Sequence, residues 1–123
     1  MSSLVEDIIE SEQEALSNAL PESFLVTSEP TSGYAALAAG KNAAIITEPD
    51  LKPESFNRLN ADFEVWLIAA EQDQVQARAA LSSGIEALMP IGFDNAYALG
   101  VTPPGTNRYF AAYKINYTNS YQI

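Results

Sequence analysis

ADFEVWLIAA, residues 61–70, leads directly into EQDQVQARAALSSGIEAL, residues 71–88, and these two stretches decide the fold. Asp62 and Glu64 alternate with apolar neighbours, and the first stretch then becomes wholly apolar. Alternation is typical of a strand with one face in water, whereas a continuous apolar run is typical of a strand covered on both faces. We therefore expect a strand that runs from an exposed end into a position covered on both faces.

The second stretch predicts a helix from Gln74 to Met89. Asp73 is a preferred residue just before a helix, and Pro90 cannot continue one. Gly84 lies inside this segment. A glycine there costs about 1 kcal/mol relative to alanine unless close packing offsets the loss.

An amphipathic helix is expected at the amino terminus. Ser3 to Glu6 match a capping box, in which the two side chains satisfy free backbone N–H groups at a helix start. Apolar residues then recur at spacings of three, four and seven, which places them on one face over about four turns. Pro21 ends this helix.

Short strands and loops fill the remainder of the chain. Residues 28–42 form a loose stretch whose alanine-rich middle allows one helical turn, and residues 48–50 form a turn. Residues 103–106 have the composition of a hairpin turn. Further strands are expected at 23–27, 43–47, 96–102 and 108–118. The expected fold is one α+β domain over residues 1–123, with a mostly antiparallel sheet of four to five strands packed with two helices.

The composition excludes several classes of function. The chain has 16 acidic and 6 basic residues, hence a net charge of −10, and it contains neither cysteine nor histidine. It therefore has no disulfide, no thiolate nucleophile and no histidine metal ligand. Gripping nucleic-acid phosphates calls for clustered Lys and Arg, against which the acidic balance argues. The acidic start and the short apolar runs indicate neither a signal peptide nor a membrane span, so we expect a protein made in the cytoplasm.

The sequence shows no catalytic constellation. Asp62 and Glu64 share a strand face, but at the strand's exposed end the favoured interpretation is a solvated edge. A serine activated without histidine calls for Ser-x-x-Lys, and the residues three before the lysines are Ala38, Pro49 and Ala111. The scattered glycines form no phosphate-binding loop, and the turn at 48–50 lacks the spaced acids of a calcium loop. We expect no enzyme activity, no cofactor and no metal.

Acidic side chains gather on the amino-terminal helix, opposite its apolar stripe. A solvated face that keeps the protein soluble is the simpler interpretation. A surface that meets a basic partner or repels DNA is the other. The candidate residues are Glu6, Asp7, Glu10 and Glu14.

A row of aromatic residues marks the carboxy-terminal strand. Alternation places Tyr109, Ala111, Tyr113, Ile115 and Tyr117 on one face. Such a row is typical either of a sheet face packed under a helix or of a protein–protein surface, where tyrosine is enriched. Both interpretations stay open.

The order of elements resembles the tail terminator family of long-tailed bacteriophages, which comprises tail-completion proteins similar to minor tail protein U. The resemblance is carried by the amphipathic first helix, by AAIITEPDL at 43–51, by FEVWLIAA at 63–70 with the alanine-rich helix after it, and by two strands around a Pro-Gly turn. It covers nearly the whole chain as a pattern of elements and hydrophobicity.

This resemblance implies a structural virion protein and no enzyme. Six copies would form a ring on the last ring of the tail tube, end tube growth and offer the surface that joins the head. The implied partners are further copies of the chain, the major tail tube protein and a head–tail connector or stopper protein, while DNA passes through the lumen without specific binding. The candidate ring or tube contacts are Tyr109, Tyr113 and Tyr117, followed by Phe93 and Tyr97.

Two other functions remain as alternatives. The first is another neck component of the same particle, such as a head-completion or stopper protein. The second is a small cytosolic module that holds a ligand against its sheet, which predicts a monomer or dimer with a closed pocket under the strand at 63–70.

Overall fold

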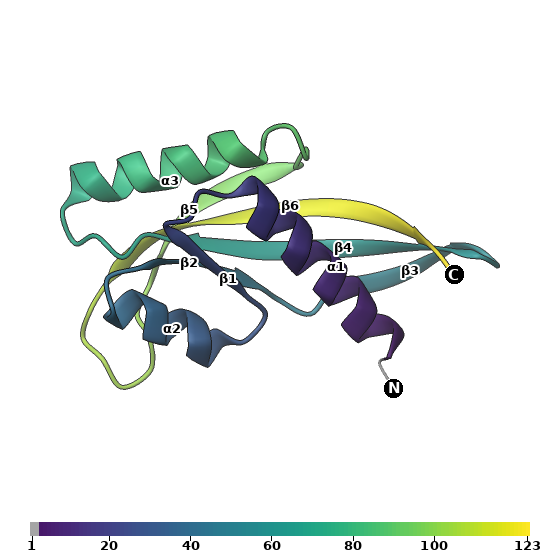
Figure 1. The fold of residues 1–123 in the computed structure, drawn as a ribbon, viewed down its shortest axis with the longest axis horizontal. Helices are drawn as coiled ribbons and strands as arrows, with labels where there is room; N and C mark the ends of the chain where they lie inside the picture. Colours follow the sequence, from purple (N-terminus) through teal and green to yellow (C-terminus); the bar gives the residue numbers. More distant parts are fainter. Residues whose placement is uncertain (1–2) are drawn as a thin grey trace.

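The computed structural model describes residues 3–123, which form three helices and one six-stranded sheet (Figure 1). The strands hydrogen-bond in the order β1-β2-β4-β6-β5, and β3 pairs with the first half of β4. The pair β1–β2 is parallel and the other pairs are antiparallel. The helices are α1 (Leu4–Ala19), α2 (Pro30–Ala38) and α3 (Gln74–Leu88), and the strands are β1 (Phe24–Thr27), β2 (Asn42–Ile46), β3 (Asp50–Ser55), β4 (Arg58–Ile68), β5 (Asn95–Val101) and β6 (Phe110–Gln122).

The α+β class and the mostly antiparallel sheet are confirmed. The expected numbers of strands and helices are too low, because two segments expected as a turn and a loose stretch are the strand β3 and the helix α2. Apart from the half-buried Leu51, the residues of β3 are exposed. The segment therefore lacks the alternating apolar pattern that predicts a strand. Helix α2 carries Gly33, whose missing side chain lets the helix lie against Ile45 of β2.

The helices divide between the two faces of the sheet. Helices α1 and α3 cover one face, where the larger core lies and where α3 contacts β4 and β6. Helix α2 covers the end of the other face where β2 pairs with β4, and there it buries a smaller core around Leu37, Ile45 and Phe110. The rest of this second face carries polar side chains of β4 and β6.

The central strand β4 changes from half-buried to buried, as its sequence predicts. Asp62 and Glu64 are half-exposed, whereas Phe63 and Val65 are buried. From residue 67 to residue 70 every side chain is buried, because this end of the strand lies between α2 on one face and α3 on the other. The long end of β4 with β3 and β6 projects beyond the helices (Figure 1).

Both long helices begin where their sequences predict. The hydroxyl of Ser3 accepts a hydrogen bond from the backbone N–H of Glu6 at 3.1 Å, and the carboxylate of Asp73 accepts one from Gln76 at 3.0 Å. Gly84 of α3 lies against Phe24, whose ring would stand 3.0 Å from an added Cβ. Close packing therefore accounts for a glycine inside this helix. Among the described residues, no helix is both long and apolar enough to cross a membrane.

Candidate functional site

The outer edge of β5 is the most distinctive feature of the molecular surface. Within residues 3–123, strand β5 pairs with β6 and with no other strand, so its other side is a seven-residue edge of unpaired backbone. Its sequence, NAYALGV, contains no charged residue and no proline. Natural proteins protect exposed edge strands with charges, prolines, bulges or covering segments, because a bare edge pairs with other chains. The β5 edge is protected by neither charges nor prolines.

The opposite side of the sheet is protected in both of its parts. Strand β3 carries Lys52, Pro53 and Glu54, and its pairing with β4 is irregular between Pro53 and Ser55. Strand β1 has only four residues, and the Gln13 side chain of α1 donates a hydrogen bond to the carbonyl of Val26 at 3.3 Å. The contrast singles out β5 as the edge that is open to another strand.

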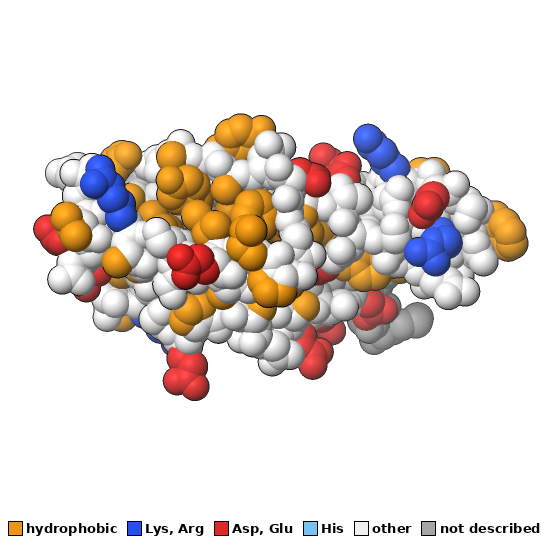
Figure 2. Space-filling model, turned by 90° about the horizontal axis from the view of Figure 1, so that it is seen from above, with side chains coloured by type: hydrophobic (Ala, Val, Ile, Leu, Met, Phe, Trp, Pro, Cys, Tyr) orange, Lys and Arg blue, Asp and Glu red, His pale blue; other side chains and the backbone are white. Residues whose placement is uncertain are grey.

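Exposed aromatic side chains flank the β5 edge on both faces of the sheet. Tyr97 is 50% exposed, and the ammonium group of Lys114 lies 5.4 Å from the centre of its ring. Tyr109 is 64% exposed on the α3 side, where its ring covers Gly100 and a side chain larger than hydrogen would collide with it. Figure 2 shows hydrophobic side chains gathered over this side of the molecule. Tyrosine beside a free edge adds contact area to the backbone hydrogen bonds that the edge offers.

The five candidate contact residues do not form one surface. Tyr113 and Phe93 are half-buried against the larger core. Tyr117 is buried under α1, so its proposal as a contact residue is corrected: its side chain belongs to the core of the subunit. For this residue the interpretation of a face packed under a helix is the right one. Tyr97 and Tyr109 remain available to a partner.

A buried carboxylate explains why Tyr117 lies inside. The Glu12 side chain of α1 is buried and accepts hydrogen bonds from the hydroxyls of Tyr117 at 3.1 Å and Tyr121 at 2.8 Å. Asn119, which lies between them on β6, donates its amide to the same carboxylate. Burial, followed by the charge and hydrogen bond of Glu12, raises the pKa of Tyr117 well above its usual range. The cluster fastens α1 to the end of β6.

The candidate acidic surface on α1 is exposed at all four of its positions, Glu6, Asp7, Glu10 and Glu14. A second acidic surface was not expected from the sequence. Carboxylates from four segments line an open hollow of about 620 Å³ on the uncovered part of the second sheet face. They are Glu48, Asp50, Asp62, Glu64 and Asp94. The alternation in β4 pointed to two of them, but only the fold brings Asp94 to their side.

An apolar hollow of about 210 Å³ adjoins this acidic hollow, since Thr47 and Glu64 line both. It lies between α2 and the sheet. Its apolar lining comprises Pro30, Tyr34, Ile45, Trp66, Ile68 and Val101. Within residues 3–123, no group of three or more carboxylates is arranged to hold a metal ion.

No protein-family model matches this sequence, and no curated protein matches it significantly.

Proposed function

We propose that the chain is a structural subunit that assembles with other protein chains and catalyses no reaction. The single observation that carries this proposal is the bare edge of β5. Strand addition to such an edge satisfies a row of backbone groups at once and takes its specificity from the flanking side chains. Tyr97 and Tyr109 supply those side chains here.

Together with the resemblance to tail terminator proteins, this edge leads to a specific role. The subunits form a ring, six in number by the resemblance, that caps the tail tube of a long-tailed phage, ends its growth and joins the head. The tube protein and a connector or stopper protein are then the partners, and the virion is the final location. Growth ends because the outer side of the ring differs from the growing end of the tube, so stacking cannot continue.

The acidic surfaces suit a ring that DNA crosses. Phosphate is held by Lys and Arg contacts. In the acidic hollow the five carboxylates outnumber the nearby lysines, Lys52 at 4.0 Å from Asp62 and Lys114 at 3.4 Å from Glu64. Net charge −10 in a chain of this size favours passage over binding. A head-completion or stopper protein would have the same need, and the partner ring to which the protein binds distinguishes these two neck functions.

The test is a charge placed on the β5 edge. Ala98 is exposed in β5, and a lysine on an edge strand blocks strand addition without disturbing the core. We expect Ala98→Lys to fold as the wild type does and to lose binding to tail tubes of the phage that encodes the chain. Ala79→Lys, which places the same charge on the exposed side of α3, is the matched control.

Tube binding and tube length are measured by electron microscopy and sedimentation. Tubes capped at one end by the wild type and by Ala79→Lys, but not by Ala98→Lys, support the proposal. Equal capping by all three proteins means that the β5 edge is not the contact, and a wild-type chain that never binds tubes overturns the terminator role.

A ligand-binding module is the second candidate, and the apolar hollow beside α2 is the observation in its favour. Its volume of about 210 Å³ is smaller than the 300–1,000 Å³ typical of pockets for drug-sized ligands. The acidic hollow is larger but open and lined by carboxylates, which suits basic groups. Assembly is therefore the better supported function.

A further inference from the structure

The tip of the β3–β4 hairpin presents a phenylalanine to solvent. Phe56 and Asn57 form the two-residue connection between Ser55 and Arg58, and Phe56 is 96% exposed. Short hairpin turns favour glycine, asparagine and aspartate, so turn chemistry does not require an aromatic residue at this position. Ile123, 58% exposed, lies beside the turn because its N–H donates to the carbonyl of Asn57 at 2.8 Å. Figure 2 shows hydrophobic side chains at this end of the molecule.

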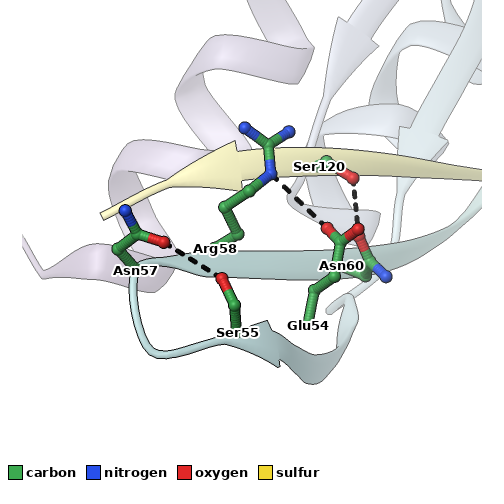
Figure 3. A network of polar contacts seen from close by, with 6 residues as sticks. All are labelled: Glu54, Ser55, Asn57, Arg58, Asn60 and Ser120. Atoms are coloured by element: carbon green, nitrogen blue, oxygen red, sulfur yellow. Dashed lines mark hydrogen bonds and ion pairs between the residues drawn. The ribbon is translucent and has the colours of Figure 1, made fainter.

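Polar contacts hold the tip in one conformation (Figure 3). The hydroxyl of Ser55 donates to Asn57 at 3.0 Å, and the guanidinium of Arg58 lies 3.5 Å from the carboxylate of Glu54. Two residues after Arg58, Asn60 of β4 accepts a hydrogen bond from the hydroxyl of Ser120 of β6 at 2.6 Å (Figure 3). Contacts of this kind therefore involve all three strands at the tip, β3, β4 and β6. A preorganised turn loses little backbone entropy when it binds.

The apolar hollow beside α2 has the size that a phenyl ring needs. Its volume is about 210 Å³, and an apolar cavity of about 150 Å³ is known to hold benzene. Tyr34 and Trp66 supply aromatic walls, and Pro30 stands at its exposed rim. The hollow is therefore large enough for a phenyl ring.

One molecule cannot place its own tip in its own hollow. Arg58 at the tip and Trp66 in the hollow stand at opposite ends of β4, roughly 25 Å apart at about 3.3 Å per residue. Figure 1 shows the hairpin and α2 at opposite ends of the molecule. Such a pair of unlike patches at opposite ends joins copies head to tail, which is the kind of contact that closes into rings.

The charges around the two patches are complementary. The hairpin tip, residues 51–58, carries Lys52 and Arg58 against Glu54, hence a net charge of +1 in a chain whose net charge is −10. The apolar hollow shares Glu64 with the adjoining carboxylate-lined hollow. A copy that inserts Phe56 therefore brings its basic side chains toward the acidic hollow of its neighbour, which favours this orientation over others.

We propose that Phe56 of one copy inserts into the hollow beside α2 of a second copy and thereby forms the contact between neighbouring subunits. The inference rests on the proposed function in one respect, that copies of the chain assemble. It leaves the β5 edge to the partner chains of that assembly. Basic groups of the hairpin and carboxylates of the hollow fix the register of the contact.

Two substitutions test the two sides of this contact. Phe56→Ala removes the ring, and because burial of a Phe side chain is the main gain, we expect association between copies to weaken about 10- to 100-fold. Pro30→Glu places a charge at the rim of the hollow and suits the first turn of α2, where an acid is favourable, so the fold is retained. Val75→Ala removes an exposed apolar side chain of α3 and is the matched control, with less than a twofold effect expected.

Cross-linking locates the contact directly, because the chain contains no cysteine of its own. Ser55→Cys protein, which keeps the Phe56 ring, is mixed with Pro30→Cys protein on assembled rings and treated with a short bis-maleimide. We expect a cross-linked dimer from this mixture, and none when Ser83→Cys on the exposed side of α3 replaces Pro30→Cys.

The outcomes separate this inference from the proposed function. Rings that persist in Phe56→Ala, with no cross-link between positions 55 and 30, overturn the inference and leave the ring itself standing. A wild-type chain that forms no ring, alone or on tubes, overturns the proposed function and this inference together.

Discussion

At the scale of single residues, Glu12 holds Tyr117 and Tyr121 of β6 against α1. Its carboxylate is buried in α1 and takes hydrogen bonds from Tyr117, Asn119 and Tyr121. The alternation of β6 predicts correctly that these positions share a face, but it does not tell a core from an interface. Helix spacing held the missing signal, because Glu12 lies four residues after Ile8 and four before Leu16, on the apolar stripe.

Removal of this carboxylate should destabilise the fold strongly. Glu12→Ala leaves three donors of β6 without their acceptor, and a loss of about 2–4 kcal/mol in the free energy of unfolding is expected. Glu10→Ala, at an exposed position of the same helix, should change that free energy by less than about 0.5 kcal/mol. Urea unfolding measures both. Equal stability of the two variants would show that Glu12 does not fasten α1 to the sheet.

Alkaline pH should unfold the protein partly through Tyr117. Because its pKa is raised in the folded state, Tyr117 stays protonated there while it ionises in the unfolded chain above about pH 10. Its contribution to stability is complete below that pH and then falls by up to about 1.4 kcal/mol per pH unit. Urea unfolding at a series of alkaline pH values should give a shallower decline for Tyr117→Phe than for the wild type, and identical declines would exclude this linkage.

At the scale of elements, the sequence predicts the strands and helices that bury apolar faces and misses those that do not. The bounds of α3 are predicted to within one residue, and those of α1 follow from Ser3 and Pro21. Strand β3 escapes prediction since it buries almost nothing and contains Pro53, features of an edge strand that also describe a loop. Strand pairing, which creates the bare β5 edge and both hollows, is set by long-range contacts that no local pattern encodes.

The packing of α3 on the sheet should depend on Gly84. A valine there would press on Phe24 and Leu67, which lie 3.0–3.3 Å from the position of its Cβ. Overpacking of this kind costs about 1–3 kcal/mol. Ser83→Val puts the same side chain on the exposed side of the helix and should cost a few tenths of a kcal/mol. Thermal unfolding compares the stability of the two variants. A Gly84→Val protein as stable as Ser83→Val would mean that α3 lies farther from the sheet than these distances indicate.

At the scale of the whole molecule, three surface features remain unexplained by folding, and we propose that they serve contact with other chains. The bare edge of β5, the exposed ring of Phe56 and the apolar hollow add nothing to the stability of a single subunit. The elements that carry them, β5, the turn between β3 and β4, and α2, lie on different parts of the molecule (Figure 1). Under the proposed function, the β5 edge would meet the tube and the two unlike patches at the ends would join neighbouring copies in a ring.

The molecular mass in solution, measured by native mass spectrometry at rising concentration and again after release from tail tubes, tests the claim of assembly most directly. Our account predicts a closed oligomer of one defined size, a hexamer of the 13.3 kDa chain by the resemblance, which falls to monomers in Phe56→Ala. A chain that remains a 13.3 kDa monomer at every concentration and is absent from the tubes would contradict it.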